Sequence, residues 1–116
     1  MSSLASKKCV PCEGGVPSLK GEQLKRYQAQ LEEEAPGWEL FETRQLRKTY
    51  RFDDFQSALD LVNQIGQLAE QEGHHPNISF GWGFVTVTIW THAIDGLSES
   101  DFVLAAKIEQ LTKSRA

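Results

Sequence analysis

The sequence has little cysteine and no long apolar segment. Its only two cysteines are Cys9 and Cys12 in a chain of 116 residues, and one close pair is not the disulfide framework of a small secreted domain. The lysines of Met1–Lys8 are not followed by the apolar run of a secretory signal. No stretch is long and apolar enough to cross a bilayer. We therefore expect a reduced, cytoplasmic protein that is not inserted in a membrane.

Positive charge is scarce as well. Twelve Lys and Arg stand against 16 Asp and Glu, and the pI is about 5.3. No basic stripe is visible, so the composition argues against a nucleic-acid-binding protein. A hydrophobic fraction of 40% supplies a modest core for one domain of this length. Small domains gain from the extra burial that self-association provides.

Residues 1–18 show no hydrophobic periodicity and are rich in glycine and proline. We interpret them as an irregular N-terminal arm, and residues 19–116 as the folded domain. Cys9 and Cys12 in this arm could form half of a zinc site, which would need two further ligands. Because the pattern supplies no such ligands, we interpret the pair as free thiols.

Apolar spacing divides the remaining chain into helices and strands. A period near 3.6 predicts helices over Lys20–Glu34 and Asp53–Gly73, and a third helix after Ser98. Alternation predicts strands over Trp38–Thr43, Arg47–Phe52, Asn77–Trp82 and Phe84–Thr91. Helices segregated beside an antiparallel sheet make an α+β fold. We expect a two-layer sandwich in the order α-β-β-α-β-β-α, with a four-stranded antiparallel sheet and three helices on one face.

Residue types at the helix ends predict how the helices begin and stop. Asp53 is a suitable N-cap for the second helix, and Ser98 with Asp101 forms a capping box for the third. Gly73 suits the left-handed position that ends a helix. The acidic run Glu32–Glu34 opposes the dipole at the end of the first helix. We expect that end to fray and to have no function.

The chain has three histidines. His74 and His75 lie between the helix-ending glycine and Pro76, and His92 follows the last predicted strand. Strand alternation places His92 on the same side as Trp90. An unperturbed pKa of about 6.5 lets histidine give or take a proton near neutrality. Because His75 precedes a proline, its backbone is biased to be extended, and the two adjacent imidazoles need not enter one pocket.

Plainer interpretations of these residues exist. A histidine after a helix-ending glycine is often a solvated turn residue, and His92 could lie on the surface. Asp101 fits a capping role, and Glu70 fits a solvated helix face. Trp82 and Trp90 fit core or interface positions. Three histidines also form some catalytic zinc sites, but no His-x-x-x-His or His-x-His spacing occurs, so we expect no metal.

A resemblance to a known family adds to this interpretation. It rests on Glu70-Gln71-Glu72-Gly73-His74-His75-Pro76, then Trp82, Thr91-His92 and Gly96-Leu97-Ser98-Glu99-Ser100-Asp101. These motifs and their spacing resemble the signature of the pterin-4a-carbinolamine dehydratases over roughly Trp38–Leu111. The Cys-Val-Pro-Cys arm lies outside that pattern and resembles the arm of some bacterial members. Gly73 stands where some animal members have an acidic residue.

The resemblance implies dehydration of a 4a-hydroxytetrahydropterin to quinonoid dihydropterin, without a cofactor, in the recycling of tetrahydropterin. The implied site contains three catalytic histidines and three residues that bind or orient: His74, His75, His92, Glu70, Pro76 and Asp101. His74 and His92 are the implied acid and base, and His75 the substrate-binding histidine. The resemblance also implies a homodimer or a homotetramer built from two dimers.

Two other classes of function remain open. The apolar stripe of Asp53–Gly73 is wider than one sheet contact requires. It could serve a non-catalytic, self-associating module that holds a protein partner. A zinc protein using Cys9, Cys12 and histidines is the other alternative.

Overall fold

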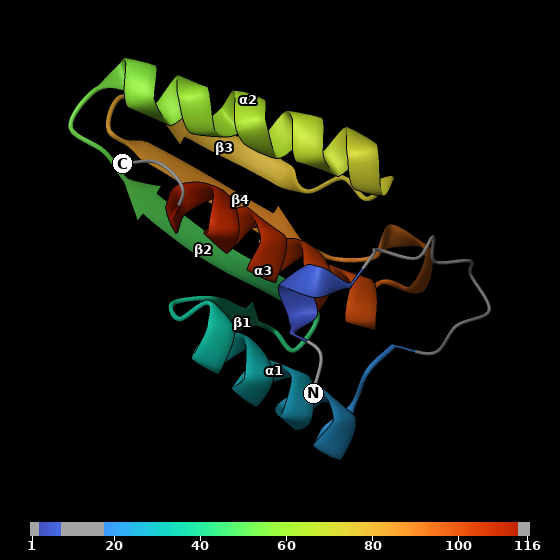
Figure 1. Cartoon of the computed structure of the whole chain (residues 1–116). Helices are drawn as coiled ribbons and strands as arrows, with labels where there is room; N and C mark the ends of the chain where they lie inside the picture. The colour runs from blue at the N-terminus through green and yellow to red at the C-terminus, as the bar shows by residue number, and fades with distance from the viewer. Residues whose placement is uncertain (1–2, 8–17, 114–116) are drawn as a thin grey trace.

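The helices lie on one face of a four-stranded antiparallel sheet (Figure 1). The computed structural model describes residues 3–7 and 18–113. The elements are the 3-10 turn η1 (Leu4–Ser6), α1 (Gly21–Glu34), β1 (Glu39–Phe41), β2 (Gln45–Arg51), α2 (Phe55–Glu72), β3 (Asn77–Gly81), β4 (Phe84–Ile89), the 3-10 turn η2 (His92–Ile94) and α3 (Glu99–Lys113). The predicted α+β sandwich and its order α-β-β-α-β-β-α are confirmed.

The strand order β1-β2-β4-β3 brings two distant loops to one end of the sheet. Asn77, at the start of β3, pairs antiparallel with Thr88, near the end of β4. The α2–β3 junction, which carries His74 and His75, therefore lies at the same end as the β4–α3 loop, which carries His92 (Figure 1).

The first hairpin differs from the prediction. β1 ends at Phe41 and β2 already begins at Gln45, whereas the sequence predicted strands over 38–43 and 47–52. Glu42 and Thr43 adopt left-handed backbone conformations, with φ of 51° and 57°, and form a tight turn. Neither is Gly or Asn, the residues that usually announce such a turn, so the sequence carried no signal for it.

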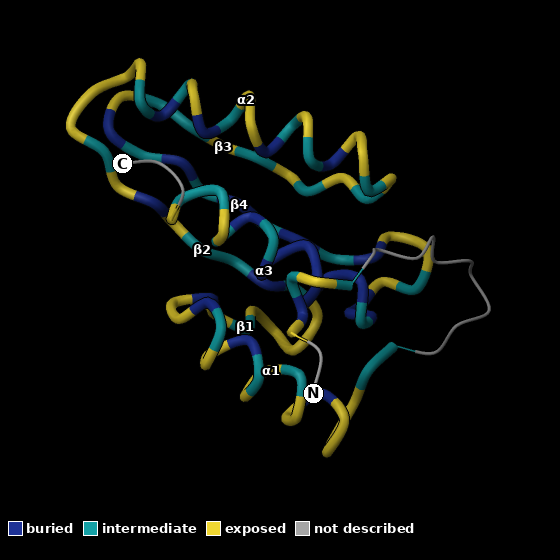
Figure 2. The backbone as a smooth tube through the Cα atoms, viewed as in Figure 1, coloured by how far each residue is buried: buried dark blue, intermediate teal, exposed yellow. Residues whose placement is uncertain are grey.

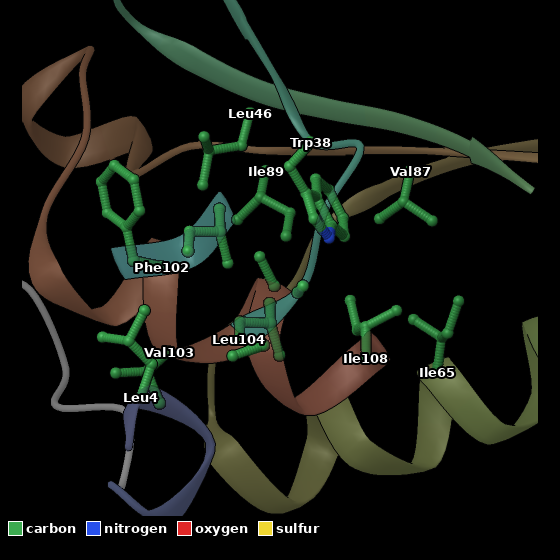
Figure 3. Packing of buried hydrophobic residues seen from close by; sticks show 14 of the residues in the cluster. Leu4, Trp38, Leu46, Ile65, Val87, Ile89, Phe102, Val103, Leu104 and Ile108 are labelled. Carbon is green, nitrogen blue, oxygen red and sulfur yellow. The ribbon is translucent and has the colours of Figure 1, made fainter. Parts of the chain in front are cut away.

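Helix α3 is the centre of the core. Phe102, Val103, Leu104 and Ile108 are all fully buried, and Figures 2 and 3 show this helix enclosed by its neighbours. Val103 and Leu104 lie beside Phe102 in sequence, so the buried surface of the helix is wider than a single stripe. Those two are buried as well because α1, α2, the sheet and η1 pack around α3 from several directions.

Within the predicted N-terminal arm, residues 4–6 form the 3-10 turn η1, which packs on α3. Leu4 is fully buried and lies beside Val103 (Figure 3). Its backbone N–H donates to both carboxylate oxygens of Glu34, at 2.8 and 3.0 Å. Lys107 donates a 2.9 Å hydrogen bond to the carbonyl of Ala5. The Glu34 carboxylate at the end of α1 is therefore the acceptor that holds η1 in place, and α1 stays helical through Glu34, where the sequence predicted fraying. Cys9 and Cys12 lie outside the described residues.

The C-terminal end of α2 agrees with the prediction, and its N-terminal end differs by one residue. Asp54, not Asp53, is the N-cap, and its Oδ1 accepts a 2.7 Å hydrogen bond from the backbone N–H of Ser57. That hydrogen bond lowers the pKa of the Asp54 carboxyl. At the other end Gly73 has φ +66° and ψ 26°, which confirms its predicted left-handed role. In the described ranges, no helix is apolar over the length that a membrane crossing needs.

Candidate functional site

The α2–β3 junction is held at both ends. The left-handed Gly73 stops the helix, and the backbone N–H of His74 still bonds back to the carbonyl of Ala69 at 3.2 Å. β3 begins at Asn77, which pairs with β4. His74, His75 and the intervening backbone are therefore fixed between a helix cap and a strand.

His74 and Asp101 form a short, enclosed pair. The His74 Nε2 and Asp101 Oδ1 atoms are 2.6 Å apart, and the two side chains are 13% and 0% exposed. A carboxylate in such a place must be matched by hydrogen-bond donors, because an unpaired buried charge is strongly unfavourable. His74 supplies one of these donors.

The other donors to Asp101 come from the end of β4 and the start of α3. Its Oδ2 accepts from the Thr91 hydroxyl and from the backbone N–H of Ser98, both at 2.8 Å, and the Ser98 hydroxyl lies at 3.4 Å. The predicted capping role of Asp101 is confirmed, and the same carboxylate also meets His74. Oδ2 takes part in the capping box, and Oδ1 faces His74.

The contacts of Asp101 fix the proton arrangement on His74. An ionised carboxylate only accepts hydrogen bonds, so opposite an ionised Asp101 the Nε2 of His74 is the donor in the contact with Oδ1. In that tautomer of the neutral imidazole, Nδ1 carries the lone pair. The arrangement suits a base, held in one tautomer by a buried carboxylate.

His75 has a different partner in a different environment. Its Nε2 lies 3.0 Å from Oε2 of Glu70, and the two side chains are 62% and 79% exposed. An ion pair in such exposed surroundings contributes little to stability. The imidazole stays accessible to a ligand from solution.

His92 is exposed at the start of η2, in a loop anchored at several points. Its ring centroid lies 4.2 Å from that of Trp90, the neighbour that strand alternation placed on the same side. Arg44 pairs with Asp95 at 3.0 Å, and the N–H of Leu19 bonds to the carbonyl of Leu97 at 2.8 Å. β4 ends at Ile89, two residues before the predicted end at Thr91.

The predicted site residues thus fall into separate contacts at one end of the sheet. His74 meets Asp101, His75 meets Glu70, and His92 meets Trp90. Pro76 lies beside a hollow of about 460 Å³ whose lining is Pro76, Asn77, Ile78, Ser79, Thr86 and Thr88. Trp82, which belongs to the motif pattern, is 72% exposed at the β3–β4 turn and lies at the opposite end of these strands.

Sequence reasoning missed the two hydroxyl groups around Asp101. Thr91 and Ser98 are both buried and both contact its carboxylate. Only the capping position of Ser98 gave any signal for this. As for metals, no three His, Cys, Asp or Glu side chains converge as a metal centre would require in residues 3–7 and 18–113.

Comparisons with known proteins agree on one family. The family model described as pterin 4 alpha carbinolamine dehydratase matches residues 18–111. A relative from Rubrobacter xylanophilus is 57% identical, with 96% of this chain and 100% of the relative covered. One from Alkaliphilus metalliredigens is 50% identical, with 95% and 96% covered. Both bear the name pterin-4-alpha-carbinolamine dehydratase, assigned only provisionally.

Solved structures show the same fold. A Brucella melitensis protein described as transcriptional coactivator/pterin dehydratase has a TM-score of 0.71 and 26% identity, covering 81% of this chain and 97% of the other. A pterin dehydratase-like protein described as a RuBisCO assembly factor in the alpha-carboxysome has a TM-score of 0.59 and 24% identity, covering 70% and 95%. From the family model and the close relatives, the chain belongs to the pterin 4 alpha carbinolamine dehydratase family.

Proposed function

We propose that the protein is a hydro-lyase that converts a 4a-hydroxytetrahydropterin to quinonoid dihydropterin and water by histidine acid–base catalysis. The observation that carries the proposal is the 2.6 Å pair of His74 and the fully buried Asp101. Family membership supplies the substrate class. The proposed role of the reaction is tetrahydropterin recycling.

The chemistry needs one proton acceptor and one proton donor. Breaking the C4a–O bond releases water if the departing hydroxyl receives a proton, and the pterin ring nitrogen loses a proton as the new double bond forms. His74 is suited to accept the ring proton at Nδ1, since its Nε2–H is directed to Asp101. His92, exposed beside Trp90, is suited to deliver the other proton. Groups that titrate near neutrality perform both transfers well.

Substrate binding is the proposed role of the more exposed groups. His75, paired with Glu70, can donate or accept a hydrogen bond at the ring edge. Pro76 and the adjoining hollow of about 460 Å³ offer room for a bicyclic ring at the same end of the sheet. The catalytic, binding and orienting roles of all six predicted site residues are part of this proposal.

We further infer that no metal or organic cofactor takes part, that the protein works in the cytoplasm, and that it is a homodimer or homotetramer. The acid–base set described above needs no electron carrier to eliminate water. Self-association would add burial to a small domain.

The direct test is an assay with chemically generated carbinolamine. Protein treated with a chelator should still accelerate the dehydration, and His74→Ala and His92→Ala should each lose most of that acceleration. Circular dichroism must show that both variants keep the fold. Unchanged rates in both variants would refute the assigned roles, and no acceleration by the intact protein would refute the function.

A non-catalytic, self-associating module of the same fold is the second candidate. A pterin dehydratase-like protein described as a RuBisCO assembly factor in the alpha-carboxysome has the same fold. This alternative predicts a stable oligomer that leaves the carbinolamine untouched. The buried His74–Asp101 pair favours the enzyme, because a scaffold gains little from enclosing a charged group beside an imidazole.

A further inference from the structure

Thr91 makes contacts in two directions. Its hydroxyl donates a 2.8 Å hydrogen bond to Oδ2 of Asp101. Its backbone pairs with Gly96, through Thr91 N to Gly96 O at 2.8 Å and Gly96 N to Thr91 O at 3.4 Å. The residue is only 5% exposed. Thr91 therefore belongs to the interior network of Asp101 and also closes the loop whose next residue is His92.

The direction of the hydrogen bonds around Thr91 follows from counting protons. A hydroxyl has one proton, and that of Thr91 goes to Asp101. The single proton of the Ser98 hydroxyl is then within reach of two acceptors, the Thr91 hydroxyl oxygen at 3.1 Å and Oδ2 of Asp101 at 3.4 Å. The two hydroxyls form a chain that ends at Oδ2, and in a low-dielectric interior each bond of such a chain strengthens the next.

These hydrogen bonds determine which carboxylate oxygen of Asp101 faces the imidazole of His74. With donors gathered on Oδ2, the Oδ1 atom is left to accept from His74 at 2.6 Å. Without the Thr91 hydroxyl, Oδ2 loses one of its two 2.8 Å donors and keeps the Ser98 N–H and the longer contact with the Ser98 hydroxyl, so the carboxylate gains freedom to turn about its Cβ–Cγ bond.

We propose that Thr91 is a positioning residue of the site: its hydroxyl holds Asp101 in the orientation that presents Oδ1 to His74, while its backbone anchors His92. The inference rests on the proposed dehydratase function and deepens it. One residue thereby links the two histidines to which the proton transfers are assigned. It contacts neither substrate nor the reacting atoms itself.

Two variants separate the hydroxyl from the shape of the side chain. Thr91→Val keeps the branched shape and removes the donor, whereas Thr91→Ser keeps the donor. We expect Thr91→Val to lower kcat about tenfold with KM changed less than about twofold, the partial loss of one charge-assisted hydrogen bond, and Thr91→Ser to stay near wild type. Ile89→Val is the control for stability alone, because Ile89, the last residue of β4, is fully buried two positions before Thr91 and has no polar side-chain atom.

A second measurement does not depend on turnover. Proton NMR should show the His74 Nε2–H far downfield and protected from exchange in the wild type, Thr91→Ser and Ile89→Val. In Thr91→Val the signal should move upfield and exchange at least about tenfold faster, because the acceptor is no longer held. Equal signals and equal kcat in the Val and Ser variants would overturn the proposal, as would absence of the signal in the wild type. If the wild type fails to dehydrate the carbinolamine, the proposed function falls, and the NMR comparison alone decides the role of Thr91.

Discussion

The Nε2 atom of His74 lies 2.6 Å from Oδ1 of Asp101, although 27 positions separate the two residues in the chain. His74 follows Gly73, which caps α2, and Asp101 lies in the first turn of α3. Their contact joins the two loops at one end of the sheet. Which nitrogen of His74 carries the proton therefore depends on the side chain at position 101.

Replacing Asp101 by asparagine tests this dependence. The amide oxygen would face the Thr91 and Ser98 donors, so the NH₂ group would face His74 and demand the opposite tautomer. The Nδ1 atom would then carry the proton and could no longer accept one. We expect Asp101→Asn to lower kcat by roughly 10²- to 10⁴-fold, by analogy with the carboxylate of a catalytic triad.

The control for Asp101→Asn is Asp60→Asn, which removes the same charge from an exposed position of α2. It should leave the rate unchanged in the same assay. If Asp101→Asn keeps more than about a tenth of the wild-type rate, the orienting role is refuted.

His75→Gln should act on binding rather than on the chemical step. The imidazole is 62% exposed and pairs with an exposed Glu70, so its removal leaves the buried network around Asp101 intact. We expect KM to rise by about 2- to 10-fold, the loss of one hydrogen bond in partly solvated surroundings, with kcat nearly constant. Steady-state kinetics at several substrate concentrations separate the two constants. A large fall in kcat would instead give His75 a part in proton transfer.

Asp54 and Asp53 form a matched pair for testing the start of α2. Only Asp54 accepts a hydrogen bond from Ser57. Asp54→Ala should therefore lower Tm by a few degrees, whereas Asp53→Ala should change it little. The lowered pKa of Asp54 contributes stability above its unfolded pKa, and the contribution is lost as the pH falls through the folded pKa. The difference between the two variants in thermal melts should accordingly shrink in acid.

Alkaline stability should depend on the two tyrosines. The hydrogen bond from Tyr27 to Glu99, with burial, raises the pKa of Tyr27 to about 12. Burial and the bond to Glu109 raise the pKa of Tyr50 as well. Unfolded tyrosine ionises near about pH 10, so the unfolded chain loses protons that the folded chain keeps. The stabilisation is complete below about pH 10 and declines as the pH rises toward the folded pKa values.

Urea unfolding at a series of alkaline pH values measures this decline, and tyrosinate absorbance follows the ionisation directly. In Tyr27→Phe the free energy of unfolding should fall less steeply with pH between the unfolded tyrosine pKa and about 12, the folded pKa of Tyr27, since that phenol no longer contributes. A phenol that ionises in the folded protein near its ordinary pKa would contradict the prediction.

Local properties were predictable from the sequence, and contacts between distant segments were not. Gly73 was correctly placed because a left-handed residue at a helix end is a local requirement. The choice between Asp53 and Asp54 failed because both precede the same apolar pattern, and the packing of α2 on the sheet decides where the helix begins. The capping role of Asp101 could be predicted from Ser98, but not the imidazole that lies opposite.

The contacts of residues 3–7 were harder to predict than the ends of the helices. A single leucine gives no periodicity, so nothing in residues 3–7 announced that Leu4 would be fully buried or that Glu34 would accept its N–H.

The docking of η1 also sets an order on folding. Lys107 bonds to Ala5 across 102 positions, and Lys7 reaches Glu99 across 92. Contacts that close so long a loop form slowly, and these cannot exist until α3 has been synthesised. Leu4 is therefore synthesised long before the α3 residues, such as Val103, that complete its surroundings.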